Sequence, residues 1–142
     1  MAYDPNNIFA RIVRGEIPCI RLYEDSHTLA FMDIMPQSPG HCLVIPKVAG
    51  ENLLDSPAES LAVAVATVQR VARAVQSALG ASGVIVQQFN GTAAGQTVFH
   101  LHFHIVPVYV AGGALKLHAR EKADPAALEQ QAAKIRAALA AG

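Results

Sequence analysis

The feature that most constrains this chain is the stretch 100–106 (His-Leu-His-Phe-His-Ile-Val), in which histidine and apolar residues alternate. Alternation with a period of two is typical of a β-strand, so the pattern predicts three imidazoles on one strand face. Leu101, Phe103 and Ile105 then share the opposite face and can be buried in a core. Pro107 lacks a backbone donor, and we expect regular strand pairing to weaken there.

Three histidines in five positions indicate either a metal site or imidazole chemistry. A strand rises about 3.3 Å per residue, so His100 and His104 are expected roughly 13 Å apart along the chain. Zinc–nitrogen bonds are about 2.0 Å long, so one zinc ion cannot bind all three imidazoles. Neighbouring pairs could still bind a metal, and a solvated polar face without chemistry is the other alternative. We favour catalysis, because neutral imidazole is a good nucleophile near pH 7.

Composition places the chain in a broad class. With 142 residues it predicts one domain, 1–142, and its 52% hydrophobic residues and mean hydropathy of +0.29 allow a substantial core. No apolar run reaches the roughly 18 residues that span a bilayer, and no signal segment is evident at the N-terminus. Eleven basic and eleven acidic residues balance, which favours neither nucleic acid nor a membrane surface as a partner. Cys19 and Cys42 are expected as reduced thiols in a cytoplasmic protein.

Four motifs together resemble one protein family. These are residues 100–106, the preceding segment 94–98 (Ala-Gly-Gln-Thr-Val), residues 41–47 (His-Cys-Leu-Val-Ile-Pro-Lys) and residues 31–34 (Phe-Met-Asp-Ile). They resemble the histidine triad (HIT) nucleotide hydrolases, and the resemblance runs from about residue 8 to residue 109. It implies an α+β fold with an antiparallel sheet of about five strands and helices on one face. It also implies a homodimer formed by sheet extension, which the sequence itself does not establish.

The resemblance further implies a hydrolase that binds a purine nucleotide and attacks its α-phosphorus without a cofactor. His102 is the nucleophile carried over, which forms a nucleotidyl-histidine intermediate that water then cleaves. His100 helps to orient the nucleophile. His104 and His41 stabilise phosphate charge or help to protonate the leaving group.

Residues 31–34 and the loop 90–97 are the expected nucleotide-binding segments. Phe31 could cover the base and Asp33 could accept hydrogen bonds from both ribose hydroxyls, because a carboxylate has about four lone-pair sites. On the residues alone, Phe31 is more readily a core side chain and Asp33 a turn residue, because aromatic residues in strands usually pack in the core. The resemblance favours the ribose role for Asp33 and leaves Phe31 open. The small residues of the loop let backbone amides approach a phosphate. The full set of expected binding residues is Phe31, Asp33, Ile34, Asn90, Gly95, Gln96 and Thr97.

No metal is expected. Some relatives carry a zinc-binding cysteine pair where this chain has Asn7 and Ala10, and a histidine where it has Ala49. With these ligands substituted, the resemblance does not extend to a structural zinc.

Helices are expected over residues 8–13, about 57–79 and about 125–140, and strands over 20–24, 27–34, 41–45, 83–89 and the triad stretch. Asp4 or Asn6 could cap the first helix, and Ser56 begins a capping box for the second. Val65 is expected on the buried side of that second helix, whereas Arg70 and Arg73 are expected to face solvent. His118 is expected to be solvated.

Three functions remain open. The first is hydrolysis of nucleoside phosphoramidates, the second is hydrolysis of dinucleoside polyphosphates, and the third is a non-catalytic nucleotide-binding or adaptor role. The intact His102 places the third below the others. The loop 90–97 has no lysine or arginine for a long phosphate chain, which favours the first over the second, although Arg11, Arg14 or Lys116 could reach the site.

Overall fold

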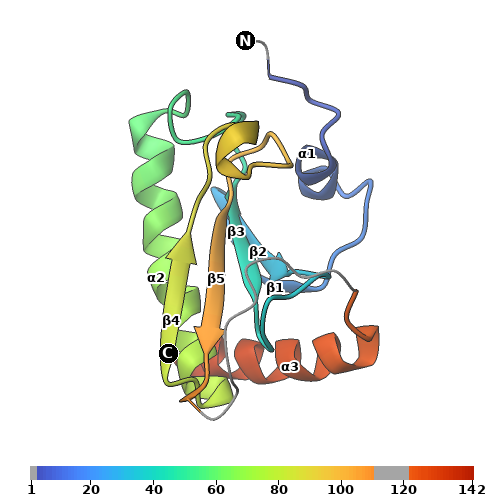
Figure 1. Ribbon diagram of the computed structural model, residues 1–142, viewed down its shortest axis with the longest axis vertical. Coiled ribbons are helices and arrows are strands. Elements are labelled where there is room, and N and C mark those ends of the chain that lie inside the picture. Colours follow the sequence, from blue (N-terminus) through green and yellow to red (C-terminus); the bar gives the residue numbers. More distant parts are fainter. Residues whose placement is uncertain (1–2, 111–121) are drawn as a thin grey trace.

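The computed structural model describes residues 3–110 and 122–142, so the expectations for Lys116 and His118 lie outside the described residues. Five strands form one antiparallel sheet in the order β1-β2-β3-β5-β4 (Figure 1). The strands are β1 (Arg21–Glu24), β2 (Thr28–Met32), β3 (Cys42–Pro46), β4 (Gly83–Gln87) and β5 (Phe103–Val108). The expected α+β fold with an antiparallel sheet is confirmed.

Helices lie on both faces of the sheet. The two long helices, α2 (Ala58–Leu79) and α3 (Pro125–Ala141), pack against each other and cover one face. The short helix α1 (Ile8–Val13) packs on the opposite face through Phe9 and Ile12 (Figure 1). The expectation of helices on one face only holds for α2 and α3, whereas α1 covers the other face.

Strand β2 shows why the sheet has two apolar faces. All five of its residues are buried, and they alternate between the two cores. Ala30 and Met32 join the core beneath α2 and α3, whereas Leu29 and Phe31 join the core beneath α1. A strand buried on both faces shows no apolar–polar alternation, so its sequence is nearly uniformly apolar.

The triad strand begins later than the pattern predicts. Residues 100–102 precede β5, which starts at Phe103, and Leu101 donates its N–H to the carbonyl of Gly50 instead of a neighbouring strand, at 2.9 Å. Pro107 lies inside β5, where pairing weakens as expected, on the β3 side only. Its missing N–H is tolerated because the pairing of β5 with β3 extends only to Ile105, so beyond that point β5 pairs with β4 alone.

Two caps and one buried position differ from the prediction. Asn7, not Asp4 or Asn6, caps α1 by accepting the N–H of Ala10 at 2.9 Å. Helix α2 has no side-chain cap, because its N-cap residue is Pro57, and the Ser56 hydroxyl donates to the carbonyl of Asn52 at 2.6 Å. Val65 is 53% exposed, and the core side of α2 is formed by Ala64, Val68, Val71, Ala74 and Val75. Arg70 and Arg73 are exposed as expected, with the guanidinium of Arg70 above the ring of Tyr23.

The loop between β2 and β3 is braced from the other end of the chain. Gly40 has a φ of +90°, and a Cβ there would lie 2.4 Å from a methyl carbon of Leu79, so only glycine fits. Its N–H donates to the side-chain oxygen of Gln131 on α3, at 3.0 Å. Helix α3 therefore holds the loop that leads into β3. Among the described residues, no helix is both long and apolar enough to cross a membrane.

Candidate active site

A cavity of about 440 Å³ lies between α1 and the sheet. Its wall is mainly apolar and is formed by α1, the end of β2 and the segment between α1 and β1. His41, His102, His104 and Asp33 provide its ionisable groups, together with Cys19. The other lining residues are Ile8, Phe9, Ile12, Ile17, Pro18, Phe31, Met32, Ile34, Met35, Gln37, Leu43, Phe89, Gly95, Thr97 and Val98.

The hydrogen bond of His102 defines which of its nitrogens can react. Nδ1 lies 2.6 Å from the backbone carbonyl oxygen of His100. A carbonyl oxygen only accepts, so Nδ1 carries the proton and Nε2 of the neutral ring keeps its lone pair. The ring is also held edge-on by Phe9, with the ring centroids 4.9 Å apart. His102 is therefore a neutral imidazole with one nitrogen able to act as a nucleophile.

His100 lies apart from the cavity, which differs from the expectation of three imidazoles on one face. Its Nε2 donates to the carbonyl of Pro46 at 2.7 Å, so its Nδ1 is an acceptor. The hydroxyl of Tyr3 lies 2.6 Å from that Nδ1 and donates to it. The departure arises because residues 100–102 precede the regular strand, where side chains need not alternate strictly.

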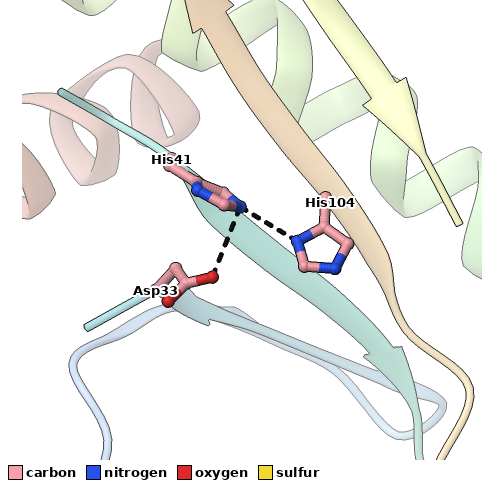
Figure 2. Close-up of side chains that lie close together, drawn as sticks. All are labelled: Asp33, His41 and His104. Carbon is pink, nitrogen blue, oxygen red and sulfur yellow. Dashed lines mark hydrogen bonds and ion pairs between the residues drawn. The ribbon is translucent and has the colours of Figure 1, made fainter. Parts of the chain in front are cut away.

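Asp33, His41 and His104 form a second polar cluster, which Figure 2 shows. His41 Nε2 lies 3.0 Å from Nδ1 of His104 and 3.3 Å from Oδ2 of Asp33. On the other side of the His41 ring, Nδ1 accepts the backbone N–H of Gln37 at 2.9 Å. That donor keeps the proton of neutral His41 on Nε2, from which it is shared between the carboxylate and His104.

Burial sets the charge state of the cluster. It lowers the pKa of His41 to about 4 and, together with the charges of His102 and His41, lowers the pKa of His104 to about 3. Burial also lowers the pKa values of His100 and His102. The same desolvation raises the pKa of Asp33 to about 6, against the N–H of Met35, which stabilises its charged form. At neutral pH, the ligand-free site thus holds four neutral imidazoles and one ionised carboxylate.

The same cluster is the candidate metal centre among the described residues. One ligand atom each from Asp33, His41 and His104 lie within 4.8 Å of one another, close enough to bind one ion. A histidine that binds a metal normally donates its other N–H to an acceptor. His41 instead faces the N–H of Gln37, so binding a metal through Nε2 would leave two donors opposed. The donor set therefore suits proton sharing better than zinc.

The nucleotide-binding residues expected near β2 all line the cavity. Asp33 lies just beyond β2 and is partly buried, with one oxygen already accepting from Met35. Ile34 is 49% exposed at the cavity mouth, and Phe31 is 3% exposed, packed edge-on against Phe9. Phe31 is thus both a core side chain and part of the cavity wall, so the two interpretations of it are compatible.

The loop 90–97 differs more from expectation. Gly95 and Thr97 line the cavity, whereas Asn90 and Gln96 do not. The Gln96 side chain is buried and bonded to backbone groups, including the carbonyl of Glu51 at 2.7 Å. Asn90 accepts the N–H of Leu53, and three loop amides donate within the turn at 92–94. The loop itself thus uses the hydrogen-bonding groups of Asn90 and Gln96, and their role in nucleotide binding stays a prediction. The three amides are those of Ala94, Gly95 and Gln96.

Several functional contacts were missed from the sequence. The sequence predicts Phe9 only as part of the helix 8–13, and Phe89, whose ring centroid lies 5.5 Å from that of His104, only as part of the strand 83–89. The apolar spacing of α1 gave no sign that its inner side faces a cavity. Gln37 and Tyr3 act through a backbone N–H and a distant contact, for which the sequence contains no local signal.

Comparison with known proteins identifies relatives over most of the chain. The HIT domain family matches residues 14–110. An adenosine 5'-monophosphoramidase of Schizosaccharomyces pombe is 44% identical over 100 residues, which cover 70% of this chain and 72% of that protein. The structure of a HIT-like protein from Bartonella henselae superimposes with a TM-score of 0.89 at 52% identity, covering 96% and 99% of the two chains. A zinc-bound histidine triad protein from Mycobacterium smegmatis gives a TM-score of 0.85 at 42% identity, covering 96% and 94%.

The buried histidines predict that acid destabilises the fold. In the unfolded chain, the imidazoles of His41 and His104 have pKa values near 6.5. In the folded protein, their pKa values are about 4 and about 3, so they take up protons only at lower pH. Folded Asp33, protonated near pH 6 instead of 3.8, offsets one of these protons below pH 6. The net effect is a loss of about 2 kcal/mol of unfolding free energy between pH 7 and pH 5.

Urea unfolding at several pH values measures this loss. His104→Gln should flatten the pH dependence of the unfolding free energy. His27→Gln, which alters an exposed histidine in the β1–β2 turn, should not. Equal slopes in all three proteins would mean that the buried imidazoles do not cause the acid sensitivity.

Proposed function

This chain belongs to the HIT domain family, and we propose that it hydrolyses nucleoside phosphoramidates, preferably of purines, through a nucleotidyl-histidine intermediate on His102. The observation that carries the proposal is the bond from Nδ1 of His102 to the carbonyl of His100, at 2.6 Å. It presents the Nε2 lone pair within an apolar cavity that also holds Asp33 and His104. Relatives named adenosine 5'-monophosphoramidase support this class of substrate.

The reaction proceeds in two displacements. Nε2 of His102 attacks the α-phosphorus, and the phosphorus–nitrogen bond to the leaving amine breaks, with its electron pair and one proton going to the amine. Water then attacks the same phosphorus, the bond to His102 breaks, and the free imidazole and a nucleoside monophosphate are formed. Dividing one difficult step into two easier ones is the advantage of a covalent intermediate.

Charge stabilisation by His41 and His104 depends on the substrate. In the free site both rings are neutral, so neither is a ready proton donor, which differs from the expectation that they help to protonate the leaving group. A phosphate anion a few ångströms away favours the charged form and raises the pKa of each ring. Binding of the substrate therefore favours uptake of a proton from solvent by His104, whose charged ring can donate to the leaving amine while the Nε2–H of His41 is donated to Asp33.

The cavity wall favours an amine over a polyphosphate as leaving group. Among the described residues that line the cavity, none is lysine or arginine. A polyphosphate leaving group carries several negative charges and gains from cationic partners. An amine needs a proton instead, and general acid catalysis by imidazole contributes about 10²- to 10⁴-fold.

The homodimer and the cytoplasmic location expected from the sequence remain predictions.

Replacement of the nucleophile tests the covalent mechanism. His102→Ala should lower kcat by on the order of 10³-fold or more, because no neighbouring group can take its place. Wild-type protein quenched during turnover of nucleotide labelled at the α-phosphorus should carry acid-labile label, and the variant should not. His27→Ala is the matched surface control. A variant that retained a tenth of the wild-type rate would exclude the intermediate on His102.

The role of Asp33 can be separated from its contact with His41 by comparing two sugars. If the carboxylate binds the ribose hydroxyls, Asp33→Ala should lower kcat/KM for ribonucleotides more than for their 2'-deoxy counterparts. A hydrogen bond to a charged group contributes about 1.5–3 kcal/mol, which is about ten- to a hundredfold in kcat/KM. Any loss transmitted through His41 affects both sugars equally. If the ratio of kcat/KM between the two sugars were unchanged, Asp33 would not bind the ribose hydroxyls.

The leaving-group preference is tested on two substrates of one nucleoside. We expect kcat/KM for adenosine phosphoramidate to exceed that for diadenosine tetraphosphate by at least about tenfold, a difference of 1.4 kcal/mol in transition-state binding. Both reactions use the same nucleophile, so the ratio reports the leaving group alone. A tenfold preference for the tetraphosphate would assign the protein to the polyphosphate hydrolases.

A further inference from the structure

We propose that Tyr3 is a positioning residue for the nucleophile, because its hydroxyl fixes His100, whose backbone carbonyl in turn binds His102. The proposal rests on the function proposed above only in naming His102 as the nucleophile. Tyr3 lies 97 positions from His100 in the chain and is outside the set of residues that line the cavity.

The contact is short, and its direction is fixed. The Tyr3 hydroxyl oxygen lies 2.6 Å from Nδ1 of His100, and the two rings meet edge to face with centroids 5.8 Å apart. Nε2 of His100 donates to the carbonyl of Pro46, so its Nδ1 can only accept while the ring is neutral. His100 is 1% exposed, so the Tyr3 hydroxyl is the donor that satisfies an otherwise buried acceptor.

Tyr3 belongs to the segment 3–7, which precedes α1 and is held by two hydrogen bonds. The side-chain amide of Asn7 donates to the carbonyl of Asp4 at 2.7 Å, and the guanidinium of Arg14 donates to the carbonyl of Pro5 at 2.7 Å. The first bond joins Asp4 to Asn7, the N-cap of α1, and the second ties the segment to Arg14 at the end of α1, the helix whose Phe9 contacts the ring of His102. Residues 3–7 thus connect one wall of the cavity to the residue that orients the nucleophile.

The His100 side chain helps to fix the direction of its own backbone carbonyl. Residues 100–102 are not part of the strand ladder, so the direction of the His100 carbonyl is not set by strand pairing. The local anchors are the Leu101 N–H bond to Gly50 and the two bonds of the His100 imidazole, to Pro46 and to Tyr3. Removing the Tyr3 hydroxyl loosens one of three anchors and leaves a buried nitrogen without its donor.

The test is Tyr3→Phe, which keeps the ring and removes only the hydroxyl. We expect kcat to fall about tenfold, with the KM for the nucleotide unchanged, because Tyr3 acts on the nucleophile and does not line the cavity. Tyr23→Phe is the matched control, since it removes a tyrosine hydroxyl bonded to Asp25 in the β1–β2 turn. Its kcat should equal that of the wild type, and the melting temperatures of the two variants show whether stability explains any difference.

A second measurement needs no substrate. Long-range ¹H–¹⁵N spectra of the imidazoles distinguish the neutral tautomers, and wild-type His102 should be protonated at Nδ1. In Tyr3→Phe, part of the His102 population should shift to the tautomer protonated at Nε2, in which the attacking nitrogen has no free lone pair. A change that was only structural would lower the melting temperature without moving this tautomer ratio.

Three outcomes would overturn the proposal: a wild-type kcat in Tyr3→Phe, a rise in KM alone, or a reduced kcat with an unchanged tautomer ratio. Failure of the proposed function is recognised separately. If His102→Ala remained active while Tyr3→Phe still shifted the tautomer of His102, the positioning role would stand and the nucleophile would have to be sought elsewhere.

Discussion

The site depends on hydrogen bonds between imidazoles and backbone groups. The backbone groups do not titrate. The carbonyl of His100 fixes the proton of His102, the carbonyl of Pro46 fixes that of His100, and the N–H of Gln37 fixes that of His41. Each partner is either an obligatory acceptor or an obligatory donor, so the tautomer of each ring follows without ambiguity. A cluster of four histidines could otherwise hold its protons in many arrangements. Here the backbone partners select one arrangement, in which the proton on His41 Nε2 is shared between His104 and Asp33.

The fold supplies these backbone partners from separate places along the chain. Gln37 lies in the loop before β3, Pro46 ends β3, and His100 precedes β5. Strands β3 and β5 are neighbours at the centre of the sheet, which brings the ends of the two segments together. The apolar side chains on the opposite face of both strands, among them Val44 and Ile105, bury against α2 and α3 and hold the strands in register. Packing on one face therefore determines proton placement on the other.

The sequence predicts the architecture well because the elements have strong local patterns. The spacing of apolar residues in α2 identifies its type and most of its core face, and the triad motif identifies β5 as a strand. It predicts contacts across the chain poorly. Gln96 resembles a phosphate-binding side chain until the loop shows that its amide bonds inward, to Glu51. Likewise, the depressed pKa values of His41 and His104 arise from burial in three dimensions, which a motif does not express.

The bond from Gln131 on α3 to the N–H of Gly40 has a consequence for biosynthesis. Every residue of the site, from Tyr3 to His104, is translated before α3 exists. The loop that carries Gln37 and leads to His41 receives its brace only when α3 has been released from the ribosome and has docked. Docking of α3 therefore helps to hold the loop whose Gln37 N–H sets the proton of His41.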